Sequence, residues 1–397
     1  MARSVDIRRV DLLLLGITVV LTLFGLAMIA SVSVFESYQL TARLYGKPYN
    51  SFFLWKSFLH MIFGFVSMGV TAIIPYHFWE RHARLIFFVT LFMVLGVFIP
   101  GIAANWGTSH SWVRIGPFSM QPAEFLKISF IFYLSVWLQK REQLIGTFKE
   151  GFLPFVTVLL ISTFFVAIQP DLGSFLVISS IACVMFFIAG GNPFQLLLGG
   201  ALSAVVGLPI ILQKEYVRAR FTAFLFPNDP TIAEGIGFQI KQALIAIGSG
   251  GFFGVGYGKS IQKFGYLPEV QADMIFSAMA EELGFMRLLI VLLMYGILVV
   301  RGYRIARHAP DRFGFLVASG ITTWIAMQTV INISVNIGLF PITGLTLPFI
   351  SSGGTSLLTV LAAVGILLNI SMHSTEEATL ARRTKRPEQS LFKGLFS

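Results

Sequence analysis

The stretch LLLLGITVVLTLFGLAMIASVSV, residues 12–34, contains no charged side chain and is almost entirely apolar. A helix needs about 20 such residues to cross the hydrocarbon core of a bilayer. Arg3, Arg8 and Arg9 precede the run. The run is longer than the core of a signal peptide, and no clear cleavage site follows it. We therefore expect a retained first transmembrane span.

Apolar runs of similar length recur along the whole chain. They lie at about residues 52–74, 84–101, 122–139, 152–169, 173–190, 194–212, 273–300, 313–336 and 345–371. Hydrophobic residues make up 55% of the 397 residues and charged residues only 12%, against roughly 25% charged residues in soluble domains. One soluble core could not bury this much apolar surface. The sequence therefore predicts an all-α polytopic membrane protein with about ten transmembrane helices.

Basic residues fall in alternate loops between these runs, and this pattern predicts the topology. They are Arg81, Arg84, Lys140, Arg141, Lys149, Arg301, Arg304, Arg307 and Arg312, followed by Arg382, Arg383, Lys385, Arg386 and Lys393 in the tail. Ten spans place all of them, with both termini, on one side, whereas nine spans would scatter them. The positive-inside rule makes that side cytoplasmic. The net charge of +10 thus reflects topology, and we expect no nucleic-acid partner.

A long segment at about 213–272 separates the seventh and eighth spans and is expected outside the cell. A structureless loop of about 60 residues is uncommon unless it is functional. We treat residues 1–371 as one transmembrane domain that includes this loop. Residues 372–397 form a basic cytoplasmic tail. No cytoplasmic segment is long enough for a nucleotide-binding domain.

The glycine-rich stretch GSGGFFGVGYGKS, residues 248–260, lies in this long loop. A P-loop requires glycine five residues before Gly258, and Phe253 stands there. Two interpretations remain. The stretch could form a flexible or re-entrant hairpin on the membrane, or a backbone surface that a phosphate or sugar approaches closely.

Carboxylates near membrane depth are costly and therefore become candidate functional residues. Asp273 begins the eighth span, where it could cap the helix or act as a general base in a low dielectric. Asp171 could likewise cap the sixth span or serve a site. Glu124 lies three residues before Lys127, so the two share a helix face as either an interfacial ion pair or part of a site.

Two further groups extend this set of candidates. At least one of Glu281 and Glu282, two turns into the eighth span, should face a protein interior. The expected external cations are Arg114, Lys214, Arg218, Arg220, Lys241, Lys259 and Lys263. Singly each could be a solvated charge, whereas gathered around one cleft they would bind pyrophosphate. No metal site is expected, because His110 has no companion ligand at metal spacing and Cys183 is the single cysteine.

Several motifs resemble the SEDS family (shape, elongation, division and sporulation), which contains FtsW, RodA and SpoVE. The motifs are WVRIGPFSMQPAEFLK at 112–127, QPDLG at 169–173, YLPE at 266–269, DMIF at 273–276, EELG at 281–284 and GLTLPFIS at 344–351, followed by Gly353 and Gly354. The segment from Arg218 through Pro227 to Lys263 contributes as well. SIQK at 260–263 and GLTLP at 344–348 are closer to FtsW than to RodA.

The resemblance implies ten helices with a large external loop between the seventh and eighth. It implies a peptidoglycan glycosyltransferase that polymerises glycan strands from lipid II at the outer face of the bacterial cytoplasmic (inner) membrane during cell division. Asp273 matches the family's essential aspartate. Polar positions that line the family's central cavity match Glu124, Lys127, Asp171 and Ser351. Arg114, Lys127, Arg218 or Lys263 would stabilise the departing pyrophosphate.

The resemblance also implies partners. These are a class B penicillin-binding protein acting as transpeptidase, other divisome or elongasome proteins, and membrane lipids. The resemblance implies no certain cofactor, although a divalent cation is compatible with it.

Three alternatives stay open from the residues alone. They are a lipid II flippase or transporter, a non-catalytic division scaffold, and a RodA-like polymerase acting in elongation. The chain also departs from the family pattern at several positions. Gln271 and Ala272 replace the usual His-Thr pair, and Ser352, Thr355 and Ser111 replace other common residues.

Overall fold

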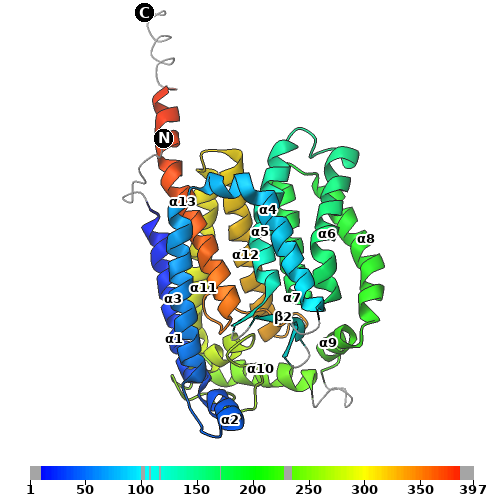
Figure 1. The fold of residues 1–397 in the computed structure, drawn as a ribbon. Helices are drawn as coiled ribbons and strands as arrows, with labels where there is room; N and C mark the ends of the chain where they lie inside the picture. Colours follow the sequence, from blue (N-terminus) through cyan, green and yellow to red (C-terminus); the bar gives the residue numbers. More distant parts are fainter. Residues whose placement is uncertain are drawn as a thin grey trace, which may run out of the picture.

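The computed structural model describes residues 10–99, 103–106, 109–115, 118–169, 171–227 and 235–384. The chain forms a bundle of helices (Figure 1). Their bounds are α1 Leu12–Val32, α2 Val34–Tyr45, α3 Phe52–Ile73, α4 Tyr76–Leu95, α5 Pro122–Lys140, α6 Leu153–Ile168, α7 Leu172–Ile188, α8 Pro193–Leu212, α9 Glu215–Leu225, α10 Ile236–Gly250, α11 Ile275–Arg307, α12 Arg312–Asn336 and α13 Gly354–Thr384.

Each of the ten predicted spans coincides with one of these helices, namely α1, α3 to α8 and α11 to α13. Among the described residues, 7 helices are long and apolar enough to cross a membrane, and α7 is a shorter apolar helix. The prediction of a polytopic helical membrane protein is confirmed. The start of α1 and the end of α13 lie at the same end of the bundle (Figure 1). We call the opposite end the loop end.

The predicted boundaries differ most from the structure in two spans. The helix of the third span, α4, begins at Tyr76 instead of residue 84. It includes the basic segment that flanks the apolar run. The tenth helix, α13, begins only at Gly354 instead of residue 345. Pro341 and Pro348 disfavour a helix in the preceding segment. The apolar residues there are buried in the protein instead of facing lipid, as the 3% exposure of Phe349 illustrates. α13 also continues beyond residue 371, to Thr384.

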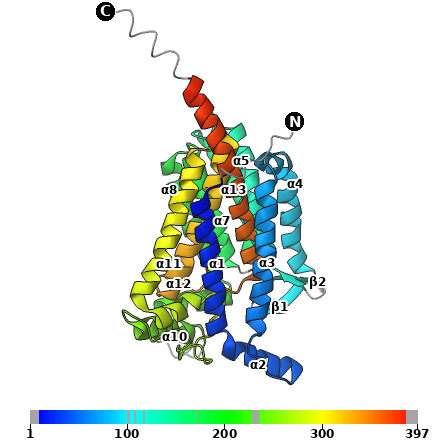
Figure 2. The ribbon, with the colours of Figure 1, turned by 90° about the vertical axis from the view of Figure 1, so that its left-hand side faces the viewer.

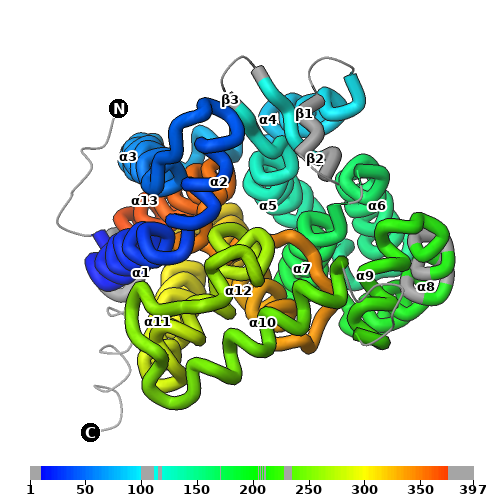
Figure 3. The backbone as a smooth tube through the Cα atoms, turned by 90° about the horizontal axis from the view of Figure 1, so that it is seen from below, coloured from blue at the N-terminus to red at the C-terminus, as the bar shows by residue number. Residues whose placement is uncertain are grey.

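α12 and α13 form the centre of the bundle. Buried residues make up 72% of the apolar window of α12 and 83% of that of α13, against 22% for α3. α13 packs along α3, and α12 contacts α5, α7, α11 and α13. Figure 3 shows α12 surrounded by these helices. Polar groups on α12 and α13 can therefore meet inside the protein, away from lipid.

A small antiparallel sheet connects α4 to α5 at the loop end. Its strands are β1 Ala103–Trp106, β2 Ser109–Ile115 and β3 Phe118–Met120, in the order β1-β2-β3. Val113 pairs with Ala103 on one side and with Met120 on the other. The apolar-run pattern did not predict these strands, which are too short to stand out in it.

The long segment between α8 and α11 is folded. It contains α9, α10 and a series of turns, which lie with α2 and the sheet at the loop end (Figures 1 and 2). These elements cover the end of the bundle where α11 begins.

The glycine-rich stretch packs against a break in α11. Gly284 has a φ of 72° and a ψ of 174°, so the helix is interrupted there. The N–H of Val255 donates to the Glu281 carbonyl, and the N–H of Phe285 donates to the Gly251 carbonyl. A Cβ on Gly254 would lie 2.3 Å from the Glu282 carbonyl oxygen. The backbone is thus engaged with α11, which favours the hairpin interpretation over a free phosphate-binding surface.

Candidate functional site

Asp273 lies just before α11, and α12 fixes its backbone. The side-chain amides of Asn332 and Asn336 both donate to the Asp273 carbonyl, at 2.9 Å. Asp273 does not cap the helix, because Met274 occupies the N-cap position and the Ser277 N–H donates to the side chain of Asn336. Asp273 is 8% exposed, and its buried Oδ1 has no hydrogen-bond partner among the described residues. A fixed backbone and an unpaired oxygen suit a proton acceptor.

The pKa of Asp273 is raised from 3.8 to about 7, and burial is the largest cause. The charge of Glu269 adds to this shift, whereas Arg220 and a backbone hydrogen bond oppose it. Glu36 on α2 also raises the pKa of Asp273. Burial raises the pKa of Glu36 itself to about 7, although a hydrogen bond from Gln271 favours its charged form. Glu269 has a φ of 52°, which is uncommon for a residue with a side chain. We call Asp273, Glu269, Glu36 and Arg220 the Asp273 site.

Arg220 on α9 is a site residue that our sequence analysis left among the general external cations. Its Nη1 donates to the Ile342 carbonyl at 2.9 Å, and its guanidinium lies 4.1 Å from the Tyr216 ring centroid. Burial lowers its pKa to about 10, while Asp273 and Asp171 favour its charged form. Arg220 therefore interacts electrostatically with two candidate carboxylates.

Arg218, which we predicted as a substrate-binding residue, lies exposed on α9. Positions two residues apart point to well-separated faces of a helix. The spacing of the two arginines on a helix indicated that only one of them could face the bundle. The sequence did not indicate which one.

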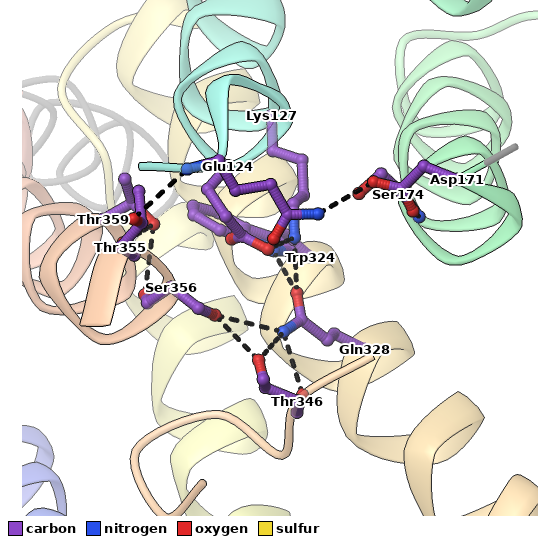
Figure 4. Close-up of polar contacts among 11 residues, drawn as sticks. Glu124, Lys127, Asp171, Ser174, Trp324, Gln328, Thr346, Thr355, Ser356 and Thr359 are labelled. Carbon is purple, nitrogen blue, oxygen red and sulfur yellow. Dashed lines mark hydrogen bonds and ion pairs between the residues drawn. The ribbon is translucent and has the colours of Figure 1, made fainter. Parts of the chain in front are cut away.

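Glu124 and Lys127 form a buried ion pair in the bundle core, as Figure 4 shows. The Lys127 ammonium lies 2.7 Å from Glu124 Oε1 and donates to Gln328 Oε1 at 2.9 Å. Trp324 donates to the same Gln328 oxygen. Lys127 is 0% exposed, so the interpretation as an interfacial pair is wrong. Glu124 Oε2 has no hydrogen-bond partner among the described residues, so the core contains an unpaired acceptor beside the ion pair.

Asp171 combines the two roles considered for it. Its Oδ1 accepts the Ser174 N–H at 2.9 Å and so caps α7, while its Oδ2 accepts the side-chain amide of Gln121, also at 2.9 Å. Figure 4 shows Asp171 on a separate helix from the Glu124–Lys127 pair. The electrostatic contact of Asp171 with Arg220 links it to the Asp273 site.

The remaining predicted site residues are Ser351, Arg114 and Lys263. Ser351 is buried and its hydroxyl accepts the Leu347 N–H at 2.8 Å, so it stabilises the segment before α13. Arg114 is exposed on β2. Lys263 is 4% exposed, and its ammonium lies 3.0 Å from Glu282 Oε1. The charge of Lys263 is therefore balanced within the protein.

Glu281 and Glu282 are both buried, which confirms that at least one faces the interior. Glu282 accepts the Ser31 hydroxyl of α1. Glu281 accepts the Ser260 hydroxyl and the Ile261 N–H. Glu282 Oε1 also accepts the Ser260 N–H at 3.4 Å, so both carboxylates bond the end of the glycine-rich stretch.

The residues that depart from the family pattern form hydrogen bonds between segments that are distant in the sequence. Gln271 bonds the carboxylate of Glu36. The Ser352 N–H donates to the Gln271 carbonyl at 2.8 Å. The Thr355 hydroxyl accepts the Gln121 N–H at 3.3 Å. Among the described residues there is no group of three or more His, Cys, Asp or Glu that could hold a metal ion.

Comparison with known proteins identifies the family. The FtsW/RodA/SpoVE family, described as "Cell cycle protein", matches residues 11–376. The chain belongs to this family. It is 40% identical to Stage V sporulation protein E of Bacillus subtilis over 92% of this chain and 97% of the relative. It is 38% identical to a probable peptidoglycan glycosyltransferase FtsW of Geobacter over 91% of this chain and 96% of the relative.

Solved structures of this family share the fold. A chain from work on "Structural coordination of polymerization and crosslinking by a peptidoglycan synthase complex" matches with a TM-score of 0.74 at 23% identity, covering 92% of this chain and 99% of that one. The rod shape determining protein RodA of Thermus thermophilus matches with a TM-score of 0.66 at 23% identity, over 92% of this chain and 98% of that one.

Proposed function

We propose that this member of the FtsW/RodA/SpoVE family is a peptidoglycan glycosyltransferase that polymerises lipid II at the outer face of the bacterial cytoplasmic membrane. The observation that carries the proposal is Asp273, a buried carboxylate with a pKa of about 7 and an unpaired oxygen. A general base works best when its pKa lies near the working pH. The names of the FtsW relatives support the same activity.

Asp273 accepts the proton of an acceptor sugar hydroxyl in this mechanism. The hydroxyl oxygen forms a bond to the anomeric carbon of the donor strand as the bond from that carbon to the lipid pyrophosphate breaks. The leaving lipid pyrophosphate carries away the electron pair of that bond. Attack from the opposite face inverts the anomeric configuration. The donor is activated by its own pyrophosphate, so the reaction requires no nucleotide.

Arg220 is the side chain best placed to stabilise the charge on the leaving pyrophosphate. It is electrostatically close to Asp273 and Asp171, and guanidinium groups bind phosphate oxygens strongly. Glu124 and Lys127 would contact polar parts of the substrate from the bundle core. Lys263 is less suited to bind the leaving group, because Glu282 already neutralises it.

The proposed orientation places the loop end outside the cell and both termini in the cytoplasm. The basic residues of alternate loops support it through the positive-inside rule. We propose a class B penicillin-binding protein as partner, because one structural neighbour comes from a synthase complex that couples polymerisation and crosslinking. A role in division is favoured over elongation by the relatives named FtsW, which are 36–40% identical.

The decisive experiment is glycan-chain formation from labelled lipid II by the purified full-length protein with its cognate transpeptidase. Asp273→Asn should lower the rate by about 10²–10⁴-fold, the usual contribution of a general base. Glu215→Gln is the matched control, because it removes a carboxylate charge from an exposed position in the same loop, and it should keep the wild-type rate. Full activity of Asp273→Asn would refute the assignment. No polymer from folded, partnered wild-type protein would favour a flippase or a scaffold.

A further inference from the structure

Helix α2 lies against the loop that carries Asp273. It connects α1 to α3 at the loop end (Figure 2). The Phe35 ring meets the Phe264 ring edge to face, with the centroids 6.0 Å apart and the planes at 72°. A Cβ on Gly265 would lie 2.7 Å from Phe35 Cε1, so the ring packs directly on the loop backbone. The start of α2 is therefore packed on the segment that leads to Asp273.

Glu36 follows Phe35 and contacts the same loop closer to Asp273. Its carboxylate accepts a hydrogen bond from the side-chain amide of Gln271. Gln271 is 4% exposed, and its amide oxygen has no hydrogen-bond partner among the described residues. A buried polar group that loses its partner is left with its full desolvation penalty. Removing Glu36 would therefore leave the buried Gln271 side chain without the partner that holds it.

Two hydroxyl groups connect α2 to the chain that follows it. The Ser37 hydroxyl accepts the N–H of Phe53, in the first turn of α3, at 3.3 Å. The Thr41 hydroxyl accepts the Tyr49 N–H at 2.7 Å. Ser37 and Thr41 are both buried. Glu36 thus projects from a helix whose place beside α3 is fixed, so it is suited to hold a neighbouring loop in place.

The turn before Asp273 depends on contacts from outside the turn. Glu269 has a φ of 52°, and such a conformation persists only where the surrounding structure enforces it. The Ala272 N–H closes the turn by donating to the Glu269 carbonyl at 2.9 Å. Between these two residues lies Gln271, whose side chain bonds Glu36. The contact with α2 therefore restrains the turn at its centre.

Other elements hold only main-chain groups near Asp273. The side chains of Asn332 and Asn336 on α12 donate to the Asp273 carbonyl, and the Ser352 N–H donates to the Gln271 carbonyl at 2.8 Å. The buried Oδ1 of Asp273 has no hydrogen-bond partner among the described residues. The place of the carboxylate therefore depends largely on the backbone that these contacts and α2 hold together.

We propose that Glu36 is a positioning residue, which through Gln271 holds the turn before Asp273 so that the Asp273 carboxylate reaches the acceptor hydroxyl. Glu36 itself touches no reacting atom in this scheme. The role of Asp273 as the base rests on the proposed function, whereas the hold of Glu36 on the turn can be measured without turnover.

The charge of Glu36 has a separate effect on the rate, with the opposite sign. It raises the pKa of Asp273, as the charge of Glu269 does, so its removal alone should lower that pKa and raise the rate below about pH 7. Loss of positioning should instead lower the rate at every pH. At about pH 9 Asp273 is almost fully ionised in all variants, so the rate there reports its position and not its protonation.

The first test measures initial rates of lipid II polymerisation at about pH 9, with the full-length protein and its cognate transpeptidase. Glu36→Ala and Gln271→Ala should each lower kcat by about tenfold or more at unchanged KM, because a displacement of about 1 Å can cost about 10²-fold. The double variant should lose no more than either single variant, since both break one contact. Gln39→Ala, at an exposed position of α2, is the matched control and should keep the wild-type rate. Wild-type kcat in Glu36→Ala, or losses that multiply in the double variant, would overturn the proposal.

A charge exchange tests the same contact if the alanine variants do not fold. Gln271→Glu places a second carboxylate against Glu36, and the repulsion between like charges at about pH 9 should separate the loop from α2 and lower kcat. Adding Glu36→Gln restores one carboxylate and one amide in exchanged positions, and it should recover most of the lost rate. A double variant as slow as Gln271→Glu alone would contradict the positioning role.

Amide hydrogen exchange of the folded protein separates this proposal from the proposed function. Glu36→Ala should speed exchange in peptides that cover residues 264–274 by about tenfold or more and leave α12 at the wild-type rate. Faster exchange of this segment, without polymer from wild-type protein, would support the positioning role and reject the polymerase. Polymer from wild-type protein, with equal exchange in Glu36→Ala and wild type, would reject the positioning role alone.

Discussion

Removing the charge of Arg220 or that of Glu269 should shift the pH midpoint of polymerisation in opposite directions. Asp273 must be ionised to accept a proton, so the rate at low substrate should rise with pH through about 7. Arg220→Gln removes the charge that favours ionised Asp273, and its pKa should rise. Glu269→Gln removes a charge that opposes ionisation, and the pKa of Asp273 should fall. The pH midpoint should therefore move up in the first variant and down in the second.

The size of the effect follows from the usual influence of a close charge. A neighbouring charge shifts a pKa by about 1–3 units, and we take about 1 unit because several groups share the site. At about pH 6, the ionised fraction of Asp273 is then about a tenth in the wild type. It is about a hundredth in Arg220→Gln and about half in Glu269→Gln. The two variants should thus differ about 50-fold in active base at that pH and converge at alkaline pH.

The assay is the initial rate of lipid II polymerisation between about pH 5 and 9, fitted for its acidic midpoint. The midpoint is compared instead of the plateau, because Arg220→Gln also loses a contact to the leaving group. Arg218→Gln removes the same charge from an exposed position on α9 and should leave the midpoint in place. Midpoints that shift in the same direction, or do not shift, would refute the assignment of Asp273 as the titrating base.

Three further predictions concern stability. The folded protein holds the pKa of Asp273 at about 7, above its usual 3.8, so ionisation costs stability increasingly between those values and fully above them. Asp273→Asn should therefore raise the thermal midpoint at alkaline pH and leave it unchanged near pH 4. Lys127→Met should destabilise the protein by about 3–5 kcal/mol, because it leaves Glu124 buried and unpaired, and Glu124→Gln in the same chain should restore much of the loss. Gly284→Ala should lower the thermal midpoint, since its Cβ would lie 2.1 Å from a backbone nitrogen at a φ of 72°, whereas Gly296→Ala, with nothing within 4 Å, should not.

Thermal denaturation of the purified variants checks all three predictions. A lower midpoint for Asp273→Asn at alkaline pH would mean that the ionised carboxylate is stabilised, contrary to the cause given for its pKa. Stable Lys127→Met protein would mean that water or another group reaches Glu124. Equal midpoints for the two glycine variants would contradict the close contact at the break in α11.

The sequence by itself determined the membrane architecture. A run such as residues 12–34 favours a membrane-spanning helix because its length and apolar composition are local properties. The alternate basic loops similarly indicated how many spans to expect. The position of Asp273 at the start of a span also followed from the order of residues. These features depend on neighbours along the chain, and they were predicted correctly.

Local patterns failed where the chain is apolar but not spanning. The segment before α13 looked like part of a span, yet Pro341 and Pro348 keep it irregular and its side chains fill the protein interior. The break at Gly284 was equally invisible, because the chain is helical on both sides of it and a single glycine does not by itself predict a break. Hydropathy measures whether a side chain avoids water, and it does not distinguish lipid from a protein core.

The tertiary structure alone decided which polar groups meet. Arg220 interacts electrostatically with Asp273, whereas Arg218 is exposed at the surface. Lys263 forms an ion pair with Glu282. Asn336 holds the Asp273 carbonyl across 63 residues of sequence. Such contacts depend on how each helix is rotated and where two helices cross. Packing over the whole bundle sets both, so no local stretch of sequence contains them.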